Sequence, residues 1–300
     1  MELNKEDITS WFQTLQDSIC NALEQLDGNG AFKEDKWDRP EGGGGRSRVI
    51  TNGDLIEKGG VNFSAVHGKT PEKILAALGI QQADFYATGV SIVLHPHNPM
   101  VPIIHMNVRY FEMSNGIWWF GGGIDVTPHY VIPEDAVFFH SELKSVCDQF
   151  DTAYYPEFKK WADDYFFIRH RNETRGIGGI FFDQLNDSKD HSKTKRWEFV
   201  QQIGELFVPV YREIANRNRA KEYTEAHQKW QALRRGRYVE FNLVWDKGTK
   251  FGLDTNGRTE SILMSMPPMA NWEYAHQPTP DSEEAKTLSL LKKDIDWINA

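Results

Sequence analysis

Apolar side chains recur at the spacing of an α-helix in several parts of the chain. The clearest case covers residues 6–27, where Trp11, Leu15, Ile19 and Leu23 fall on one face before the sequence DGNG ends the pattern. In some of the further helices, a proline at the first position marks the start or a glycine after the last position marks the end. Further helices are predicted over residues 70–79, 134–150, 156–168, 194–218, 224–235 and 281–298.

Runs with period-two alternation, rich in β-branched and aromatic residues, predict strands. Four of them are GVSIVLHPHNP, VPIIHMNVRYFEM, GIWWFGG and GGIFFDQL. RYVEFNLVWD (residues 237–246) and ESILMSMPP (residues 260–268) are predicted as a fifth and a sixth strand. The strands cluster at residues 84–130, ahead of most of the helices, which favours an α+β fold with an antiparallel sheet covered by helices. No internal repeat or linker divides the chain, so we expect a single domain over residues 1–300.

Two glycine-rich stretches need an explanation, because glycine loses more backbone entropy on folding than any other residue. The polar segment KEDKWDRPEGGGGRSRVITNG is interpreted as a mobile loop or a backbone cradle. In WWFGGGID, three glycines remove side chains beside an aromatic run, just before Asp125. This arrangement favours a bulky ligand that lies against the backbone and satisfies the carboxylate with its N–H groups. The alternative is a glycine-rich turn in which Asp125 caps local backbone N–H groups.

Strand alternation also predicts a patch of polar side chains. It places His105, Asn107 and Arg109 on one face of VPIIHMNVRYFEM, and it aligns Ser91 with His95 in the strand before. If the two strands pair as a hairpin, these five side chains converge. The alternative is the solvent-facing side of a half-exposed sheet, although such faces usually carry Lys, Glu and Thr.

The composition narrows the class of partner. The 300 residues include 34 Lys and Arg against 43 Asp and Glu, a net charge of −9, which argues against nucleic acid or an anionic membrane surface. Neither Cys20 nor Cys147 has the spacing of a disulfide framework or a zinc site, and no apolar run approaches the length of a membrane span. These features predict a soluble, cytoplasmic protein.

Sequence motifs for common cofactors are missing. RGIGGIFFD fails the dinucleotide fingerprint at its third glycine, and no GxxxxGK[ST] loop occurs, so no nicotinamide, flavin or nucleotide cofactor is predicted. The ten histidines leave a metal site open. No two of His95, His105, His140 and His170 stand in HxH or HxxxH spacing, and HPH at residues 95–97 is the nearest approach. Acid–base or structural roles and metal ligation therefore both stand as interpretations.

Seven segments in the same order resemble the oxygen-dependent coproporphyrinogen III oxidases of haem biosynthesis. They are GGGGRSRVI, GVSIVLHPHNP, HMNVRYFE, WWFGGGIDVTPHY, RGIGGIFFD, RGRYVEFNLVWDKGTKFGL and GRTESILMSMPP, and the resemblance covers roughly residues 7–298. It implies a homodimer of α+β subunits, each with a large, flat antiparallel sheet sandwiched between layers of helices. It also implies oxidative decarboxylation of two propionate groups of coproporphyrinogen III to vinyl groups, giving protoporphyrinogen IX. Dioxygen would be the acceptor, and no organic cofactor would be needed.

The resemblance further implies roles for individual residues. Asp125 matches the acid that engages the pyrrole N–H groups, and His105 matches the proposed proton donor. Residues from about 238 to 273 correspond to a stretch linked to dimerisation. The substrate-contacting positions are Ser91, Asn107, Val108, Arg109, Asn256, Gly257 and Arg258, with Asn256 standing where glycine is common. A divalent metal is assigned to His95, His105, His140 and His170.

The chemistry of a reduced tetrapyrrole agrees with these residue types. Aromatic and glycine surfaces suit its faces, one carboxylate suits its inward N–H groups, and arginines pair with its propionates. The arginines available are Arg109, Arg258, Arg175 and Arg46 or Arg48. Two rival functions remain open: a metal-dependent oxygenase that uses the histidines, and a non-catalytic tetrapyrrole carrier with the same pocket.

Overall fold

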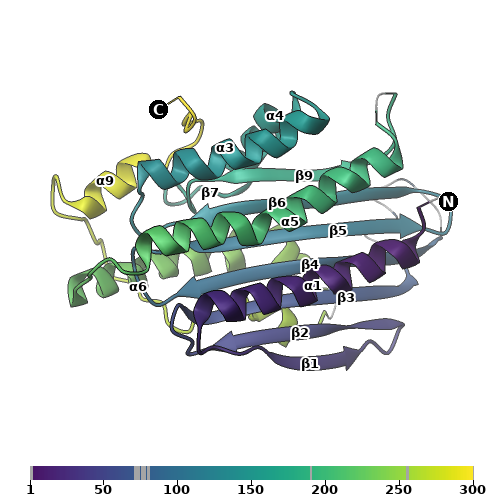
Figure 1. The fold of residues 1–300 in the computed structure, drawn as a ribbon, viewed down its shortest axis with the longest axis horizontal. Helices are drawn as coiled ribbons and strands as arrows, with labels where there is room; N and C mark the ends of the chain where they lie inside the picture. The colour runs from purple at the N-terminus through teal and green to yellow at the C-terminus, as the bar shows by residue number, and fades with distance from the viewer. Residues whose placement is uncertain are drawn as a thin grey trace.

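A seven-stranded antiparallel sheet forms the centre of the computed structural model, which describes residues 3–70, 75, 79, 82–189, 191–254 and 257–299. Its strands are β1 (Lys33–Asp38), β2 (Gly43–Thr51), β3 (Ile56–Lys69), β4 (Asp84–Pro96), β5 (Ile103–Met113), β6 (Trp118–Thr127) and β9 (Gly179–Leu185). Strands β1 to β6 neighbour one another in chain order, and β9 joins beside β6 only after two helices (Figure 1). A separate small pair consists of β7 (Phe167–Ile168) and β8 (Glu173–Thr174).

Three long helices cover one face of this sheet, which we call the core face (Figure 1). They are α1 (Lys5–Asp27), α3 (Pro133–Phe150) and α5 (Lys193–Asn218). The strand residues beneath them are apolar and fully buried, as Val90, Val108 and Ile124 show. Leu15, Ile19 and Leu23 of the predicted apolar face of α1 pack into this core. Trp11 is only partly buried, and its neighbour Phe12 is fully buried instead. Burial of these side chains removes apolar surface from water and is the main stabilising contribution to the fold.

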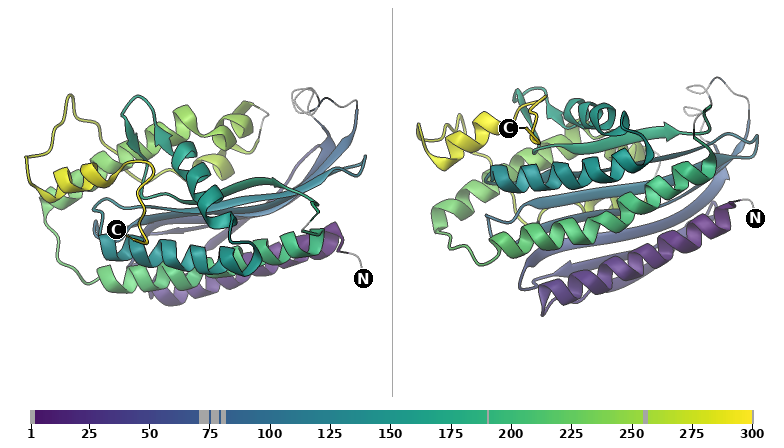
Figure 2. Two further views of the ribbon diagram at one scale, coloured as in Figure 1. Left: turned by 90° about the horizontal axis from the view of Figure 1, so that it is seen from above. Right: turned by 45° about the horizontal axis from the view of Figure 1, so that its top comes forward.

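Shorter helices lie on or beside the opposite face, which we call the site face. They are α4 (Tyr154–Tyr165), α6 (Glu225–Glu240), the π-helical turn η1 (Phe241–Trp245), α7 (Lys247–Asp254), α8 (Thr259–Leu263) and α9 (Glu283–Leu290). In Figure 2, α6 and the helices after it lie across the sheet from α1, α3 and α5. Helix α8 touches the sheet directly, since Asn62 Nδ2 donates to Ser261 O at 2.7 Å. The predicted α+β fold, with an antiparallel sheet between layers of helices, is confirmed.

The glycine-rich segment predicted as a mobile loop or cradle forms strands β1 and β2 instead. Its glycines allow close approach: a Cβ on Gly43 would lie 2.2 Å from Ala65 O, and one on Gly45 would lie 2.5 Å from the Trp37 ring. Gly42 and Gly43 have φ of +130° and +82° in the turn between the strands, where other residues are strained. Exposed edge strand β1 carries no apolar alternation, so the sequence pattern did not reveal it.

Two segments predicted as strands are helical. Residues 237–246 continue α6 and form η1, and residues 260–268 include α8. The predicted helix end at Gly236 is also wrong, because α6 runs on to Glu240. A Cβ on Gly236 would lie 2.3 Å from Asn271 O, so glycine is required there by a crossing segment. Short apolar runs do not distinguish a buried strand from a helix by periodicity alone.

The other predicted helices are present, some with shifted ends. Those over 134–150 and 194–218 match α3 and α5 within one residue, whereas the one over 156–168 is α4 and ends at Tyr165. The one over 281–298 is helical only in α9. The helix predicted over 70–79 lies mostly outside the described residues. Within the described ranges, no helix has both the length and the apolar composition that a membrane span requires.

The end of α1 is tied to the start of β3 by one buried carboxylate, that of Asp27. It accepts backbone N–H groups from Gly30 at 2.7 Å, Asp54 at 2.9 Å, Leu55 at 3.0 Å and Ile56 at 2.8 Å. Burial would raise the pKa of this carboxyl, but the four donors outweigh burial and hold it below its usual 3.8.

Asp27→Ala is expected to lower the free energy of unfolding by about 3 kcal/mol at pH 7, because buried N–H groups lose a charged acceptor. The pKa of Asp27 is lower in the folded state than in the unfolded state, where it is near 3.8. The stabilisation is therefore complete above the unfolded-state pKa. It is lost as the pH falls through the folded-state pKa. Urea unfolding at pH 7 and at pH 3 measures both effects. Asp27→Asn, which keeps one acceptor oxygen, should lose less. Equal stability of wild type and Asp27→Ala at pH 7 would contradict this account.

Candidate active site

The site face carries the polar side chains predicted from strand alternation. Three successive rows cross β4, β5 and β6: Val93, His105 and Asp125; Ser91, Asn107 and Gly123; and Gly89, Arg109 and Gly121. The register therefore places Ser91, His105, Asn107 and Arg109 on one face, and Asp125 joins them directly beside His105. The consecutive glycines are strand residues of β6, so the alternative of a glycine-rich turn is wrong.

Asp125 is only 2% exposed, and the protein itself binds both of its carboxylate oxygens. His105 Nδ1 lies 2.8 Å from Oδ1, and Arg175 Nη2 donates to Oδ2 at 2.6 Å. Burial would raise the pKa of this carboxyl, but Arg175 and then His105 outweigh burial and lower it, so Asp125 is ionised. The expectation that ligand N–H groups must satisfy the carboxylate is thus not met. Each oxygen still keeps lone-pair capacity for a further donor.

Arg175 lies in a box of aromatic rings and is 2% exposed. Its guanidinium carbon is 4.3 Å from the ring centroid of Phe166, 4.9 Å from that of Tyr238 and 4.8 Å from that of Phe241. Such rings attract a cation and exclude water from it. The sequence offered Arg175 as a partner for a propionate, but the structure gives its guanidinium to Asp125. No sequence motif signalled the box, because its rings come from the residue after α4, from α6 and from η1.

Arg109 lies flat across the bare backbone of Gly121. Its Nη1 donates to Asn107 Oδ1 at 2.9 Å, and its Nη2 is 3.0 Å from Asp183 Oδ1. About a third of each charged side chain is exposed, 36% for Arg109 and 32% for Asp183. A Cβ on Gly121 would lie 2.9 Å from Arg109 Nε, which explains the glycine. Sequence reasoning assigned no role to Asp183, although its place in GGIFFD, on the strand next to Gly121, was an available signal.

Some predicted contacts fall on the wrong face. The side chain of Val108 is fully buried on the core face, so only its backbone borders the site. Arg46 and Arg48 both pair with Asp17 of α1, at 3.3 Å and 2.7 Å. These two arginines therefore do not face the site, because strand alternation sends their side chains toward the core-face helices.

Two of the remaining predicted substrate contacts, Gly257 and Arg258, lie directly before α8. Arg258 is the N-cap of that helix and pairs with Asp35 of β1. Its Nη1 also donates to Ser261 Oγ at 3.0 Å. Gly257 comes directly before it, whereas Asn256 lies outside the described residues. Arg258 therefore borders the β1–β2 side of the site face, away from Arg109 on β5.

The four histidines assigned to a divalent metal are not gathered into one donor set. No group of three or more His, Cys, Asp or Glu side chains is placed to hold an ion in the part of the chain that the structure describes. His95 and His140 are fully buried, and burial lowers the pKa of each to about 3. His170 lies at the surface, and only His105 adjoins Asp125. The donor arrangement therefore does not fit a metal ion, and the metal assignment stays a prediction.

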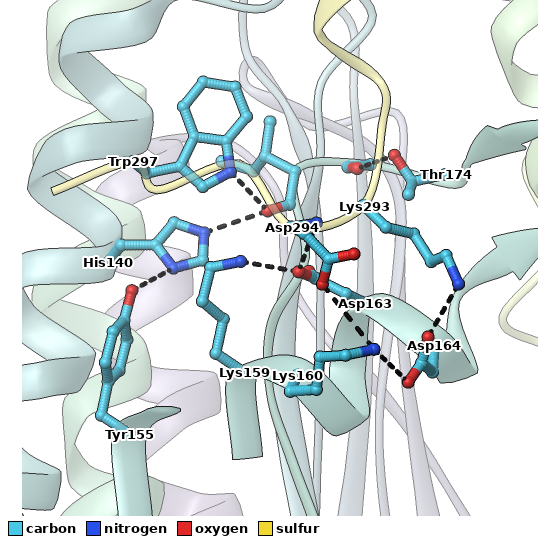
Figure 3. A network of polar contacts seen from close by, with 12 residues as sticks. His140, Tyr155, Lys159, Lys160, Asp163, Asp164, Thr174, Lys293, Asp294 and Trp297 are labelled. Carbon is cyan, nitrogen blue, oxygen red and sulfur yellow. Dashed lines mark hydrogen bonds and ion pairs between the residues drawn. The ribbon is translucent and has the colours of Figure 1, made fainter. Parts of the chain in front are cut away.

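His140 belongs instead to a polar network around the loop between β8 and β9 (Figure 3). Its Nε2 and Trp297 Nε1 both donate to Ile177 O, at 3.0 Å and 3.1 Å, and its Nδ1 accepts from Tyr155 OH at 3.0 Å. The same loop carries Arg175 two residues before Ile177. The network therefore fixes the loop that presents Arg175 to the carboxylate at the site.

Two comparisons with known proteins bear on this chain. The sequence model of the family described as "Coproporphyrinogen III oxidase" matches residues 7–297. The curated protein "Coproporphyrinogen-III oxidase 1, chloroplastic" of Arabidopsis thaliana is 49% identical over 298 residues, which cover 94% of this chain and 76% of that protein. The family match spans all the site residues described above.

Arg175→Met is expected to lower the free energy of unfolding by about 3–5 kcal/mol, because it leaves Asp125 as a buried charge with one donor. Adding Asp125→Asn should restore most of this loss, because the uncompensated charge is removed. Urea unfolding of the single and double variants gives the coupling energy. As a control, Lys229→Met breaks an exposed pair with Glu225 and should leave the free energy of unfolding close to that of the wild type. A double variant less stable than either single variant would refute this view of the pair.

Proposed function

Since the chain belongs to the coproporphyrinogen III oxidase family, we propose that its reaction takes place on the site face, beside the linked side chains of His105, Asp125 and Arg175. The protein is an oxidoreductase of haem biosynthesis that oxidatively decarboxylates coproporphyrinogen III. One observation carries the placement: an ionised, buried carboxylate shares a sheet face with a partly exposed histidine and a partly exposed arginine.

Two propionate groups of the substrate become vinyl groups, which gives protoporphyrinogen IX. For each group we assign dioxygen as the electron acceptor. A C–H bond breaks at the carbon next to the ring, the carboxylate leaves as carbon dioxide, and two electrons pass to dioxygen. One propionate, one dioxygen and one proton thus give one vinyl group, one carbon dioxide and one hydrogen peroxide. The protein must orient the propionate and move the proton.

Asp125 and His105 act on the ring and on the proton. The side chain of His105 is 23% exposed and that of Asp125 only 3%, so the ring approaches from the His105 side. The remaining lone pairs of Asp125 accept pyrrole N–H bonds and make the ring electron-rich enough to react with dioxygen. An ionised carboxylate only accepts, so His105 donates its Nδ1–H to Asp125 and keeps Nε2 to carry the proton.

Arg109 holds the carboxylate of the reacting propionate. Arginine pairs with carboxylates through two parallel N–H bonds, and Asn107 keeps this guanidinium aligned at 2.9 Å. Asp183 already occupies one side of it, so an incoming carboxylate competes with Asp183. Ser91 lies in the same row as Asn107 and offers a hydroxyl to the substrate, and Arg258 suits a propionate at the α8 side.

A homodimer is part of the proposal. Four large apolar side chains of η1 and α7 are exposed: Leu243 by 47%, Val244 by 44%, Phe251 by 46% and Leu253 by 40%. They fall within residues 238–273, the stretch that the resemblance links to dimerisation. Exposed apolar side chains grouped on adjacent segments support a protein interface at this place.

Location and metal content remain predictions for this chain. The Arabidopsis relative is described as chloroplastic, and a cytoplasmic location stays the expectation from the sequence. No step is assigned to a divalent metal, because the four histidines do not form one donor set. A metal-dependent oxygenase therefore has no support from the geometry, and a non-catalytic carrier disagrees with membership of an enzyme family.

Asp125→Ala is expected to lower kcat by about 10²–10⁴-fold, the range typical for removing a group that acts on proton transfer. The assay is dioxygen consumption together with carbon dioxide release from reduced coproporphyrinogen III. Thermal unfolding of the variant must first show that it is folded, since Arg175 loses its partner. Turnover close to that of the wild type would exclude Asp125 from the chemistry.

Two variants, one of Arg109 and one of its partner Asp183, should change KM in opposite directions in the same assay. Arg109→Ala is expected to raise KM by about tenfold or more, because a charge-assisted hydrogen bond contributes about 1.5–3 kcal/mol. Asp183→Asn should lower KM, because it removes the competing carboxylate while keeping the side-chain shape. A higher KM in Asp183→Asn would show that Asp183 aids binding rather than competing.

Leu243→Asp is expected to convert the dimer to monomers, because a charge cannot be buried unpaired in an apolar interface. Sedimentation equilibrium at micromolar concentration measures the mass. Tyr274→Asp is the matched control, since Tyr274 is 100% exposed and lies just outside residues 238–273. A monomeric wild type, or a dimer that survives Leu243→Asp, would place the interface elsewhere.

A further inference from the structure

Three aromatic rings continue the site face beyond Arg109. Phe111 follows Arg109 by two residues on β5, Trp119 pairs with Phe111 on β6, and Phe85 lies near the start of β4. The ring centroids of Phe111 and Trp119 are 4.3 Å apart with planes at 25°, and those of Phe85 and Phe111 are 6.1 Å apart with planes at 6°. We call these three stacked side chains the aromatic row.

The aromatic row lies outside the hydrophobic core. Strand alternation sends Trp118 and Phe120 to the core face, where Phe120 stacks on Trp197 of α5 at 5.5 Å. The members of the aromatic row stay partly exposed on the site face. Helices α6, α7 and α8 lie toward the other end of the sheet, and the strand ends reach beyond them (Figure 2). Grouped and partly exposed apolar side chains mark places where a protein binds another apolar surface.

The row is continuous with the residues to which we assign chemistry. Gly89 and Gly121 flank Arg109 between the row and the His105–Asp125 pair, so this stretch of the face carries little side-chain bulk. Phe111 follows His105 by six positions on β5, which corresponds to about 20 Å of strand. The row is therefore too distant to exchange a proton with the His105–Asp125 pair, but it shares one surface with that pair.

Guanidinium groups lie on two sides of the row. Arg109 lies two residues before Phe111 on β5, on the side toward His105. Beside Phe85, the guanidinium carbon of Arg39 is 5.7 Å from the ring centroid, and its side chain is 30% exposed. Arg39 donates to His67 O at 2.9 Å and lies 3.4 Å from Glu41, so it is held in place but remains open to a carboxylate. This pattern of flat rings between two cations complements an apolar macrocycle with carboxylate arms.

We propose that the aromatic row is an outer subsite for the substrate, whose pyrrole rings pack against the open edges of these rings while propionate arms pair with Arg109 and Arg39. The inference rests on the proposed function, because the ligand is the substrate of that reaction. Two propionates must reach the single Arg109 in turn. The outer subsite keeps the intermediate with one vinyl group on the protein while the ring changes its position between the two steps.

Trp119→Ala tests the subsite. Trp118→Ala is the matched control, because it removes the same kind of side chain from the adjacent residue, which faces the core. The probe is coproporphyrin III, the oxidised, unreactive and fluorescent form of the substrate, titrated into each protein. Trp119→Ala and Phe111→Ala are each expected to raise the Kd for this probe, and KM for coproporphyrinogen III, by about tenfold, as for loss of one aromatic contact. We expect kcat to change by less than about twofold, and chromatography should show more released intermediate.

Trp119→Tyr should restore both constants, and Trp118→Ala should leave them within about twofold of the wild type. The subsite is overturned if Kd and KM are unchanged in Trp119→Ala, or if Trp118→Ala raises them equally. Should thermal unfolding show that Trp119→Ala is not folded, Phe85→Ala near the strand end takes its place with the same expected result. A wild type that releases no carbon dioxide would refute the proposed function instead. The porphyrin titration would still report whether the row binds the macrocycle.

Discussion

The arrangement of the candidate site depends on one buried ion pair, between Asp125 and Arg175. Removing an unpaired carboxylate from water costs several kcal/mol, and a protein usually avoids this cost by protonating the group. Here Arg175 and His105 both donate to Asp125, so it stays ionised while almost fully buried. The aromatic box around Arg175 excludes water from the other half of the pair. The strand register and the loop before β9 both serve to hold these groups within hydrogen-bonding distance.

A second constraint is that the site face carries few bulky side chains near its backbone. Gly121 lets the Arg109 guanidinium lie flat, and Gly45 does the same for the Trp37 ring. Gly60 allows Met264, just after α8, to approach the sheet. Glycine in strands is costly in entropy, and the chain bears this cost where flat groups must come near the backbone. A surface built in this way accepts a wide, flat molecule more readily than a pleated surface of bulky side chains.

Local patterns could predict only part of this. Alternation predicted β4 to β6 and the shared face of His105 and Arg109, because side chains on a strand alternate by geometry alone. It did not reveal β1 to β3, which are rich in polar residues and glycine, and it mistook η1 for a strand. The partners of Arg175 and Arg109 depend on β9 arriving beside β6 after two helices, and no local pattern contains that pairing.

The network of Figure 3 makes residues 293–297 part of this scaffold. Trp297 shares Ile177 O with His140, and Asp294 N donates to Asp163 Oδ2 at 3.0 Å. The loop held in this way presents Arg175. A proteolytic cut just before Asp294 would therefore disturb the environment of the Asp125 carboxylate from a distance, without touching β5 or β6.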